Sequence, residues 1–201
     1  MRAVLIWGVL LGVAFVALGV AAASPYLEWR DPVYIVAGFA GVVALVLLLF
    51  QPLLVAGVLP GIARAKGRRV HLWTGAALVL AVLVHVGGLW ITSPPDVVDA
   101  LLFASPTPFS AWGVVAMWAV FAAALLGAFR RRLGLSPRIW RLGHSLLVAI
   151  VVIGTVGHAL LIEGTMGSVS KVVLCGLAGA ALLKAFADQR SWTLLRWRSR
   201  S

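Results

Sequence analysis

The four histidines of this sequence all lie within apolar stretches, and they form two pairs with the same spacing. His71 and His85 are 14 residues apart, and His144 and His158 repeat that interval. Imidazole is costly to place in lipid, so a histidine in a membrane span normally faces the interior of the helix bundle and marks function. Fourteen residues make nearly four helical turns, which places both members of a pair on one helix face, about 21 Å apart along the axis.

Two opposed imidazoles can supply both axial ligands of a haem iron, and haem is a large apolar cofactor suited to a gap between helices. A dinuclear metal site needs ligands that converge within a few Å, which a separation of about 21 Å along one helix excludes. A single zinc ion normally takes four ligands, and no Cys, Asp or Glu lies within the spans at either histidine level. The alternative is that each histidine only finds a local hydrogen-bond partner, but the repeated interval favours haem ligation.

Transmembrane helices are the elements that must position these histidines. The chain has 201 residues and is 62% hydrophobic and only 11% charged, which is far from the composition of a soluble domain. Six apolar stretches are each long enough to cross a hydrocarbon core of about 30 Å as a helix. The predicted spans are Val4–Ala23, Val33–Val58, Val70–Thr92, Phe109–Phe129, Pro137–Ile162 and Ser170–Ala187. The predicted fold is an all-α integral membrane protein, a single six-helix bundle over residues 1–201.

The histidine pairs fall in the third and fifth spans, which run in the same direction. His71 and His144 are therefore predicted to share the inner level of the membrane. His85 and His158 are predicted to share the outer level. Between these two spans, Pro94–Pro95 is predicted to end the third span, and Asp96 to begin a short interfacial helix.

The basic residues predict the orientation of the bundle. Fifteen of the 17 Lys and Arg residues fall on one side of the predicted spans, and five of the six acids fall on the other. By the positive-inside rule both termini are expected to be cytoplasmic, in a multi-pass protein of the bacterial inner membrane. The net charge of +11 then reflects topology and contact with membrane lipid, not nucleic-acid binding. The tail, residues 188–201, is expected to anchor at anionic headgroups through its arginines and through Trp192 and Trp197.

The N-terminal stretch, one proline and the single cysteine also carry structural information. The N-terminal stretch has the basic start and the small-residue end of a signal peptide, but its apolar run is longer than usual, which favours an uncleaved first helix. Pro52 predicts a kink in the second span. The single cysteine, Cys175, lies within a span and is expected to pack there.

Arginines and glycines flank the histidines. Arg68 and Arg141 each lie three residues before an inner-level histidine, on the same helix face. A guanidinium there would suit a haem propionate, although ordinary positive-inside charge explains it equally well. The glycines beside the histidines would let a porphyrin approach the backbone or would pack helices together. They are Gly75, Gly87, Gly88, Gly143, Gly154 and Gly157.

The stretches "HLWTGAALVLAVLVH" and "RRRLGLSPRIWRLGHSLLVAIVVIGTVGHALL" resemble the ferric reductase-like transmembrane family, over about residues 35–187. This family includes the membrane halves of ferric reductases and NADPH oxidases, and the haem-binding subunit of periplasmic methionine sulfoxide reductase systems. The resemblance implies two b-type haems between these two spans and electron flow from the cytosol outward. His71, His85, His144 and His158 match the ligand positions of the family.

The sequence departs from many family members in one respect, since no Gly-rich dinucleotide motif follows the sixth span. No flavin site is therefore predicted on this chain, and the expected electron donor is a separate cytoplasmic flavin reductase or a quinol. The first functional hypothesis is a membrane cytochrome that reduces an outside acceptor such as ferric iron. The second is a quinol-fed haem subunit of a periplasmic oxidoreductase. More remote alternatives are a transporter or proton channel without haem, and the cytochrome b subunit of a quinol-oxidising complex.

Overall fold

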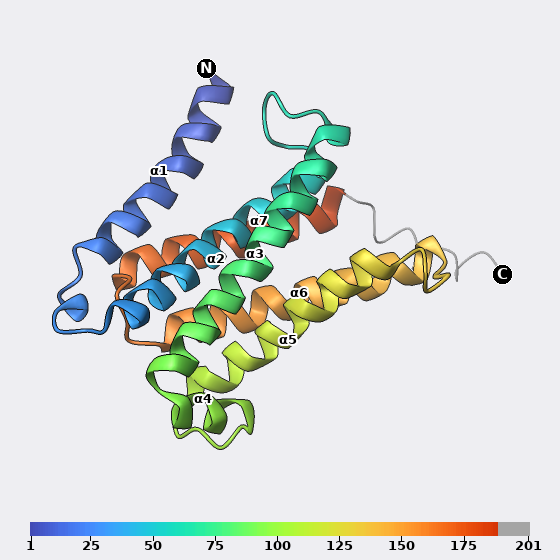
Figure 1. Cartoon of the computed structure of the whole chain (residues 1–201). Coiled ribbons are helices and arrows are strands. Elements are labelled where there is room, and N and C mark those ends of the chain that lie inside the picture. The colour runs from blue at the N-terminus through green and yellow to red at the C-terminus, as the bar shows by residue number, and fades with distance from the viewer. Residues whose placement is uncertain (189–201) are drawn as a thin grey trace.

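The computed structural model describes residues 1–188, and within them the chain is helical without strands. Six helices are long and apolar enough to cross a membrane, so the chain is a multi-pass integral membrane protein (Figure 1). They are α1 Arg2–Ala22, α2 Pro32–Ala56, α3 Arg64–Thr92, α5 Pro108–Phe129, α6 Pro137–Leu161 and α7 Ser168–Asp188. Two short elements, η1 Pro25–Leu27 and α4 Pro94–Leu101, lie in the connections. The predicted fold class is therefore confirmed, and the tail from residue 189 onward, with its predicted anchors Trp192 and Trp197, lies outside the described residues.

Local sequence signals set the ends of these helices. Asp31 caps α2 by accepting a hydrogen bond of 2.7 Å from the backbone N–H of Val33, and Pro32 follows at the first helical position, where no N–H is needed. Ser136 and Pro137 start α6 in the same way. At the other end of α2, Gly57 adopts a left-handed conformation with φ 69°, which a residue without a Cβ tolerates.

One helix boundary differs from the sequence prediction. The basic segment just before the predicted third span is helical as well, since α3 begins at Arg64 and not at Val70. Its long cationic side chains can reach the polar membrane surface while their backbone stays helical. As in the predicted second span, α2 continues through Pro52 to Ala56, and the kink at Pro52 stays a prediction. The short helix expected near Asp96 is present as α4, with Asp96 in its first turn.

The helices pack as two hairpins. α3 packs mainly on α2 and α6 mainly on α5, whereas direct contact between α3 and α6 is slight. α7 contacts both α2 and α6, and α1 lies against α7 and α2 (Figure 1). The histidine-bearing helices α3 and α6 therefore belong to different hairpins, and the main links between these hairpins are α7 and the contacts of α3 with α5.

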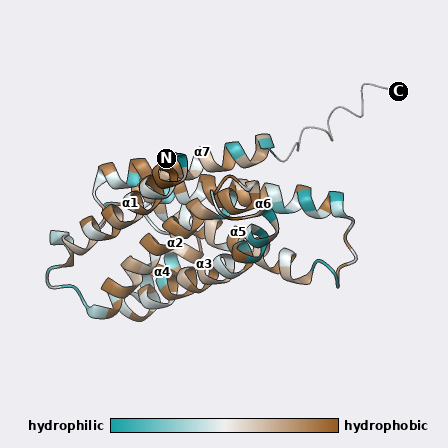
Figure 2. Cartoon of the chain, turned by 90° about the horizontal axis from the view of Figure 1, so that it is seen from above, coloured by the Kyte–Doolittle hydropathy of each residue, from teal (hydrophilic) through white to brown (hydrophobic). Residues whose placement is uncertain are grey.

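Charged residues separate the two ends of the bundle. We call the end that holds the arginines at 64–69 and 130–141 the basic end, and the end that holds Glu28, Asp31, Asp96, Asp99 and Glu163 the acidic end. Hydrophobic residues cover most of each helix, and hydrophilic residues gather toward the helix ends, clearly so where α6 begins (Figure 2). α1, α3 and α6 run from the basic to the acidic end, and the other spans run back.

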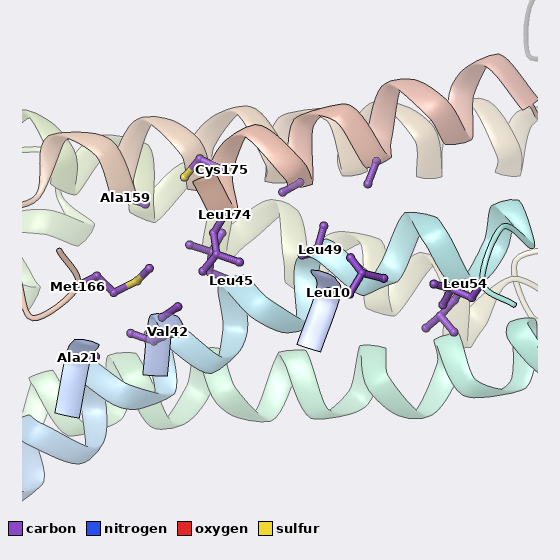
Figure 3. Packing of buried hydrophobic residues seen from close by; sticks show 14 residues of the cluster. Leu10, Ala21, Val42, Leu45, Leu49, Leu54, Ala159, Met166, Leu174 and Cys175 are labelled. Atoms are coloured by element: carbon purple, nitrogen blue, oxygen red, sulfur yellow. The ribbon is translucent and has the colours of Figure 1, made fainter. Parts of the chain in front are cut away.

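Two apolar clusters form the core. The first joins α1, α2 and α7 and includes Leu10, Leu49, Leu174 and the buried Cys175 (Figure 3). The second joins α2, α3, α5, α6 and α7. Since lipid is as apolar as leucine, tight van der Waals packing is what favours these contacts inside a membrane.

Removing a fully buried leucine should therefore destabilise the bundle. Leu174 is 0% exposed on α7, and Leu174→Ala should cost about 2–4 kcal/mol through lost packing and a residual cavity. The expected result is a clearly lower melting temperature of the detergent-solubilised protein. Leu183→Ala is the matched control, because Leu183 lies on the same helix but is 70% exposed. Equal melting temperatures for the two variants would contradict this description of the core.

Candidate functional site

The structure brings the four histidines together in two pairs. The ring centroids of His71 and His144 are 6.4 Å apart, with 77° between the ring planes. Those of His85 and His158 are 6.3 Å apart, with 79° between the planes. The first pair lies toward the basic end and the second toward the acidic end. Each pair joins one histidine of α3 to one of α6, so the imidazoles face each other where the two helices hardly touch.

The acidic-end pair is held by backbone carbonyls of the neighbouring helices. Nδ1 of His85 lies 2.8 Å from the carbonyl oxygen of Ala37 on α2, and Nδ1 of His158 lies 2.9 Å from that of Phe109 on α5. A carbonyl oxygen only accepts hydrogen bonds, so Nδ1 must carry the proton and Nε2 the free lone pair. This tautomer makes Nε2 the atom available for a metal.

The basic-end pair is held less tightly. Nδ1 of His71 lies 3.3 Å from the carbonyl oxygen of Gln51. Nδ1 of His144 is buried and points toward the backbone of Ala123 without reaching hydrogen-bond geometry. The two pairs therefore share one design, but the contacts that orient the rings are weaker at the basic end.

Two glycines of the neighbouring helices cradle the acidic-end rings. A Cβ on Gly41 would lie 3.0 Å from Nδ1 of His85, and a Cβ on Gly113 would lie 2.6 Å from Nδ1 of His158. The second distance is shorter than real Cβ contacts, so at Gly113 the ring occupies the space where a side chain would begin. The two hairpins match in detail, since each acidic-end histidine bonds to a carbonyl 48 or 49 residues earlier in the chain.

Sequence reasoning missed these two glycines because it considered only the glycines on the histidine helices. The signal that could have found them is the likeness of the hairpins, in which a glycine precedes His85 and His158 at nearly the same distance. Of the glycines on the histidine helices, a Cβ added to Gly88 would lie 2.7 Å from the Cβ of Ala37, and a Cβ added to Gly154 or Gly157 would lie 3.0 Å or less from residues of α5. These three glycines let helices pack closely, which was the second of the two interpretations given for the glycines beside the histidines. Gly87 has no neighbouring atom within 4 Å.

Further polar and aromatic groups surround the basic-end pair. The buried side chain of Gln51 donates from Nε2 to Oγ1 of Thr74 at 2.7 Å, and the backbone of Gln51 faces His71. On α6 the ring of Trp140 stacks on His144, with centroids 5.4 Å apart and 12° between planes. The guanidinium of Arg130 lies 4.5 Å from the centre of the Trp140 ring, a cation–π distance. None of these contacts was foreseen from the sequence.

The predicted propionate partners stay at the surface. Arg68 and Arg141 are exposed at the basic end, and within residues 1–188 neither has a hydrogen-bond or ion-pair partner. Both are free to meet a carboxylate, and their role remains a prediction.

An apolar layer separates the two levels. Leu78 lies midway between the histidines of α3, and Val151 lies midway between those of α6. Both residues are buried in the second core cluster, together with Ala119 and Val120 of α5. Seven residues make nearly two helical turns, so Leu78 and Val151 project from the same faces as the histidines. Each helix therefore presents an imidazole, an apolar side chain and an imidazole in succession.

Fold and site define a multi-pass membrane protein built around two levels of paired histidines. A family model described as "Ferric reductase like transmembrane component" matches residues 37–155, more than half of the chain. The chain therefore belongs to the ferric reductase-like transmembrane family, whose members are generally haem-binding and serve transmembrane electron transfer. The matched segment holds three of the four histidines, and His158 lies just beyond it. Neither the curated proteins nor the solved structures gave a match.

The geometry of each pair fits a haem iron. Two metal–nitrogen bonds of about 2 Å, each extended by about 1 Å to its ring centre, place opposed imidazole centroids about 6 Å apart, close to the observed 6.4 and 6.3 Å. The proton on Nδ1 leaves Nε2 free to coordinate. No group of three or more His, Cys, Asp or Glu side chains suited to a metal ion gathers within residues 1–188. Two protein ligands per level suit a porphyrin, which itself supplies the other four.

The glycine cradle should be essential for the acidic-end site. In Gly113→Ala the new Cβ would push the ring of His158 away from its carbonyl partner, and if each histidine pair holds a haem, as predicted, the purified protein should lose about one of two. Haem content per chain measures this result. Gly127→Ala is the matched control, since Gly127 lies on the same helix and a Cβ added there would have no atom within 4 Å. Full haem content with an unchanged spectrum in Gly113→Ala would show that the cradle does not hold the ligand.

Proposed function

We propose that this protein is a b-type membrane cytochrome that carries electrons across the bilayer. His71 and His144 would hold one haem, and His85 and His158 would hold the other. The observation that carries the proposal is the pairing of opposed imidazoles at two levels, at a spacing that leaves room for one iron in each pair. When bound, haem iron supplies one-electron exchange between its ferrous and ferric states.

The residues of this chain would set the properties of both sites. The carbonyls of Ala37 and Phe109 fix the tautomer and orientation of the acidic-end ligands and increase their basicity. The apolar layer around Leu78 and Val151 keeps water from the space between the levels. Two histidines would hold each haem, so the chemistry that the haem would supply here is electron exchange and not substrate binding. Reduction of the acceptor would then take place at the periphery of the site.

We propose that the basic end faces the cytoplasm of a bacterial cell, by the positive-inside rule. The donor would be a separate cytoplasmic flavin reductase or a membrane quinol, and the acceptor would be outside, such as ferric iron or a periplasmic oxidoreductase. Proteoliposomes distinguish the two donors. If the donor is a quinol, a quinol alone should reduce the haem. If the donor is a flavin reductase, only NADH together with that reductase should reduce it. Reduction by neither would exclude both donors.

An absorption spectrum tests the central proposal. The dithionite-reduced protein should show the sharp bands of a low-spin b-type cytochrome with about two haems per chain. The imidazole planes of each pair are nearly perpendicular, so the oxidised protein should give strongly anisotropic low-spin electron paramagnetic resonance signals. Protein that is folded and carries no haem when expressed with an ample haem supply would refute the proposal.

Single substitutions test the pairing. His85→Ala should remove one haem and leave the other, because its partner His158 would lose the opposed ligand. His71→Ala should remove the other haem. The two variants should therefore retain haems with different redox potentials, measured by spectroelectrochemical titration. If either substitution removed both haems from a folded protein, the two levels would not be independent sites.

A further inference from the structure

Lys171, near the start of α7, is the one charged side chain that is buried within residues 1–188, at 8% exposed. A buried charge is costly unless it is paired and hydrogen-bonded. The one ion pair within residues 1–188 joins Lys184 and Asp188. No carboxylate of these residues therefore lies within 4 Å of the Lys171 ammonium. Lys171 therefore lies buried at the acidic end without a counter-ion.

Its hydrogen bonds are also incomplete. Nζ donates to the carbonyl oxygen of Ile162 at 2.6 Å, which satisfies one carbonyl at the end of α6. An ammonium has three N–H donors and no acceptor. The described structure supplies a partner for one donor, so two remain for a ligand.

Lys171 also lines a cavity of about 510 Å³, a volume within the range of small-molecule sites. The end of α1, η1 and the connection from α6 to α7 form its walls, and these segments come together in Figure 1. The hydroxyl-bearing side chains of Tyr26, Thr165 and Ser168 line it as well. One carboxylate, that of Glu163, belongs to the lining and is exposed.

The cavity is linked to the acidic-end histidine pair through the end of α6. The carbonyl oxygen of Ile162 accepts the hydrogen bond from Lys171. The N–H of Ile162 in turn donates to the carbonyl oxygen of His158 at 3.1 Å. A molecule bound on Lys171 would thus lie at the helix end that follows a predicted haem ligand. Such a position suits an electron acceptor.

We propose that this cavity binds a small carboxylate-bearing electron acceptor, with a carboxylate of the ligand on Lys171. The buried ammonium supplies the counter-charge and two donors, and the hydroxyl groups of the lining supply further donors. Glu163 weakens the binding of ligands with excess negative charge, so a free polycarboxylate such as citrate should bind less tightly than a carboxylate whose remaining part is cationic or holds a metal ion. The role as acceptor site rests on the proposed function, whereas carboxylate binding does not.

Calorimetry with citrate as the probe tests the site on the full chain in detergent, and no haem reaction is needed. Lys171→Met should weaken citrate binding roughly tenfold or more, as expected for a lost charge-assisted contact, and Lys171→Arg should retain most of it. Arg30→Met is the matched control, since Arg30 is an exposed cation at the same end, over the ring of Tyr34. Glu163→Gln removes an exposed carboxylate and should tighten binding, which tests the site even if Lys171→Met fails to fold.

A kinetic measurement tests the role of the site. In the reaction with ferric citrate, one electron passes from the reduced protein to the ferric ion, which becomes ferrous, and no bond forms or breaks. Lys171→Met should raise the ferric citrate concentration needed for half-maximal reoxidation roughly tenfold. Reoxidation by the cationic hexaammine complex of cobalt(III) should be unchanged, as should the haem spectrum.

The outcomes separate the claims. Citrate binding without a haem spectrum would refute the proposed cytochrome function, while the proposed carboxylate site at Lys171 would stand. A normal haem spectrum, with citrate binding absent or equal in wild type, Lys171→Met and Glu163→Gln, would overturn the site. If nanodiscs with phosphatidylglycerol abolish citrate binding that nanodiscs of phosphatidylcholine permit, the cavity holds a lipid headgroup and the proposed acceptor site is wrong.

Discussion

The N–H of an imidazole inside an apolar span is costly to leave without an acceptor, and this cost explains how three of the four histidines are held. Backbone carbonyls of the adjacent helix are the acceptors for His71, His85 and His158, since a helical carbonyl oxygen keeps a second lone pair. When Nδ1 of a ring donates to the adjacent helix of its own hairpin, Nε2 on the other side of the ring points away from that helix. The hydrogen bonds within each hairpin thereby turn the free nitrogens toward the opposite hairpin.

Close approach within each hairpin makes these bonds possible. Gly41 and Gly113 leave space for the rings of the acidic-end pair, and Gly88 and Gly154 let the backbones of neighbouring helices meet. Between the hairpins the situation is reversed, because α3 and α6 hardly touch. Small residues thus lie where helices pack, and the histidines lie where they do not. This distribution separates the packing role of glycine from the binding role of histidine.

Much of this arrangement could be predicted from the sequence. Helix periodicity and apolar length give the six spans, and the 14-residue interval gives two levels on one face. The start of α3 at Arg64 was missed because hydropathy marks the apolar core and not the helix that extends beyond it. The contacts of Gly113 and Trp140 were missed because they depend on which helices neighbour each other, and a single sequence does not show this. The burial of Lys171 is hidden for the same reason.

The α7 helix carries no histidine, yet it has its own influence on the histidine site. α7 packs against α2 of one hairpin and α6 of the other, and Ala178 at its centre is 0% exposed. Its thickness therefore sets how far apart the two hairpins stand. Small side chains on α7 act as a spacer of fixed width for both levels at once. Variation at α7 would thus alter the fit of a cofactor without touching any residue that binds it.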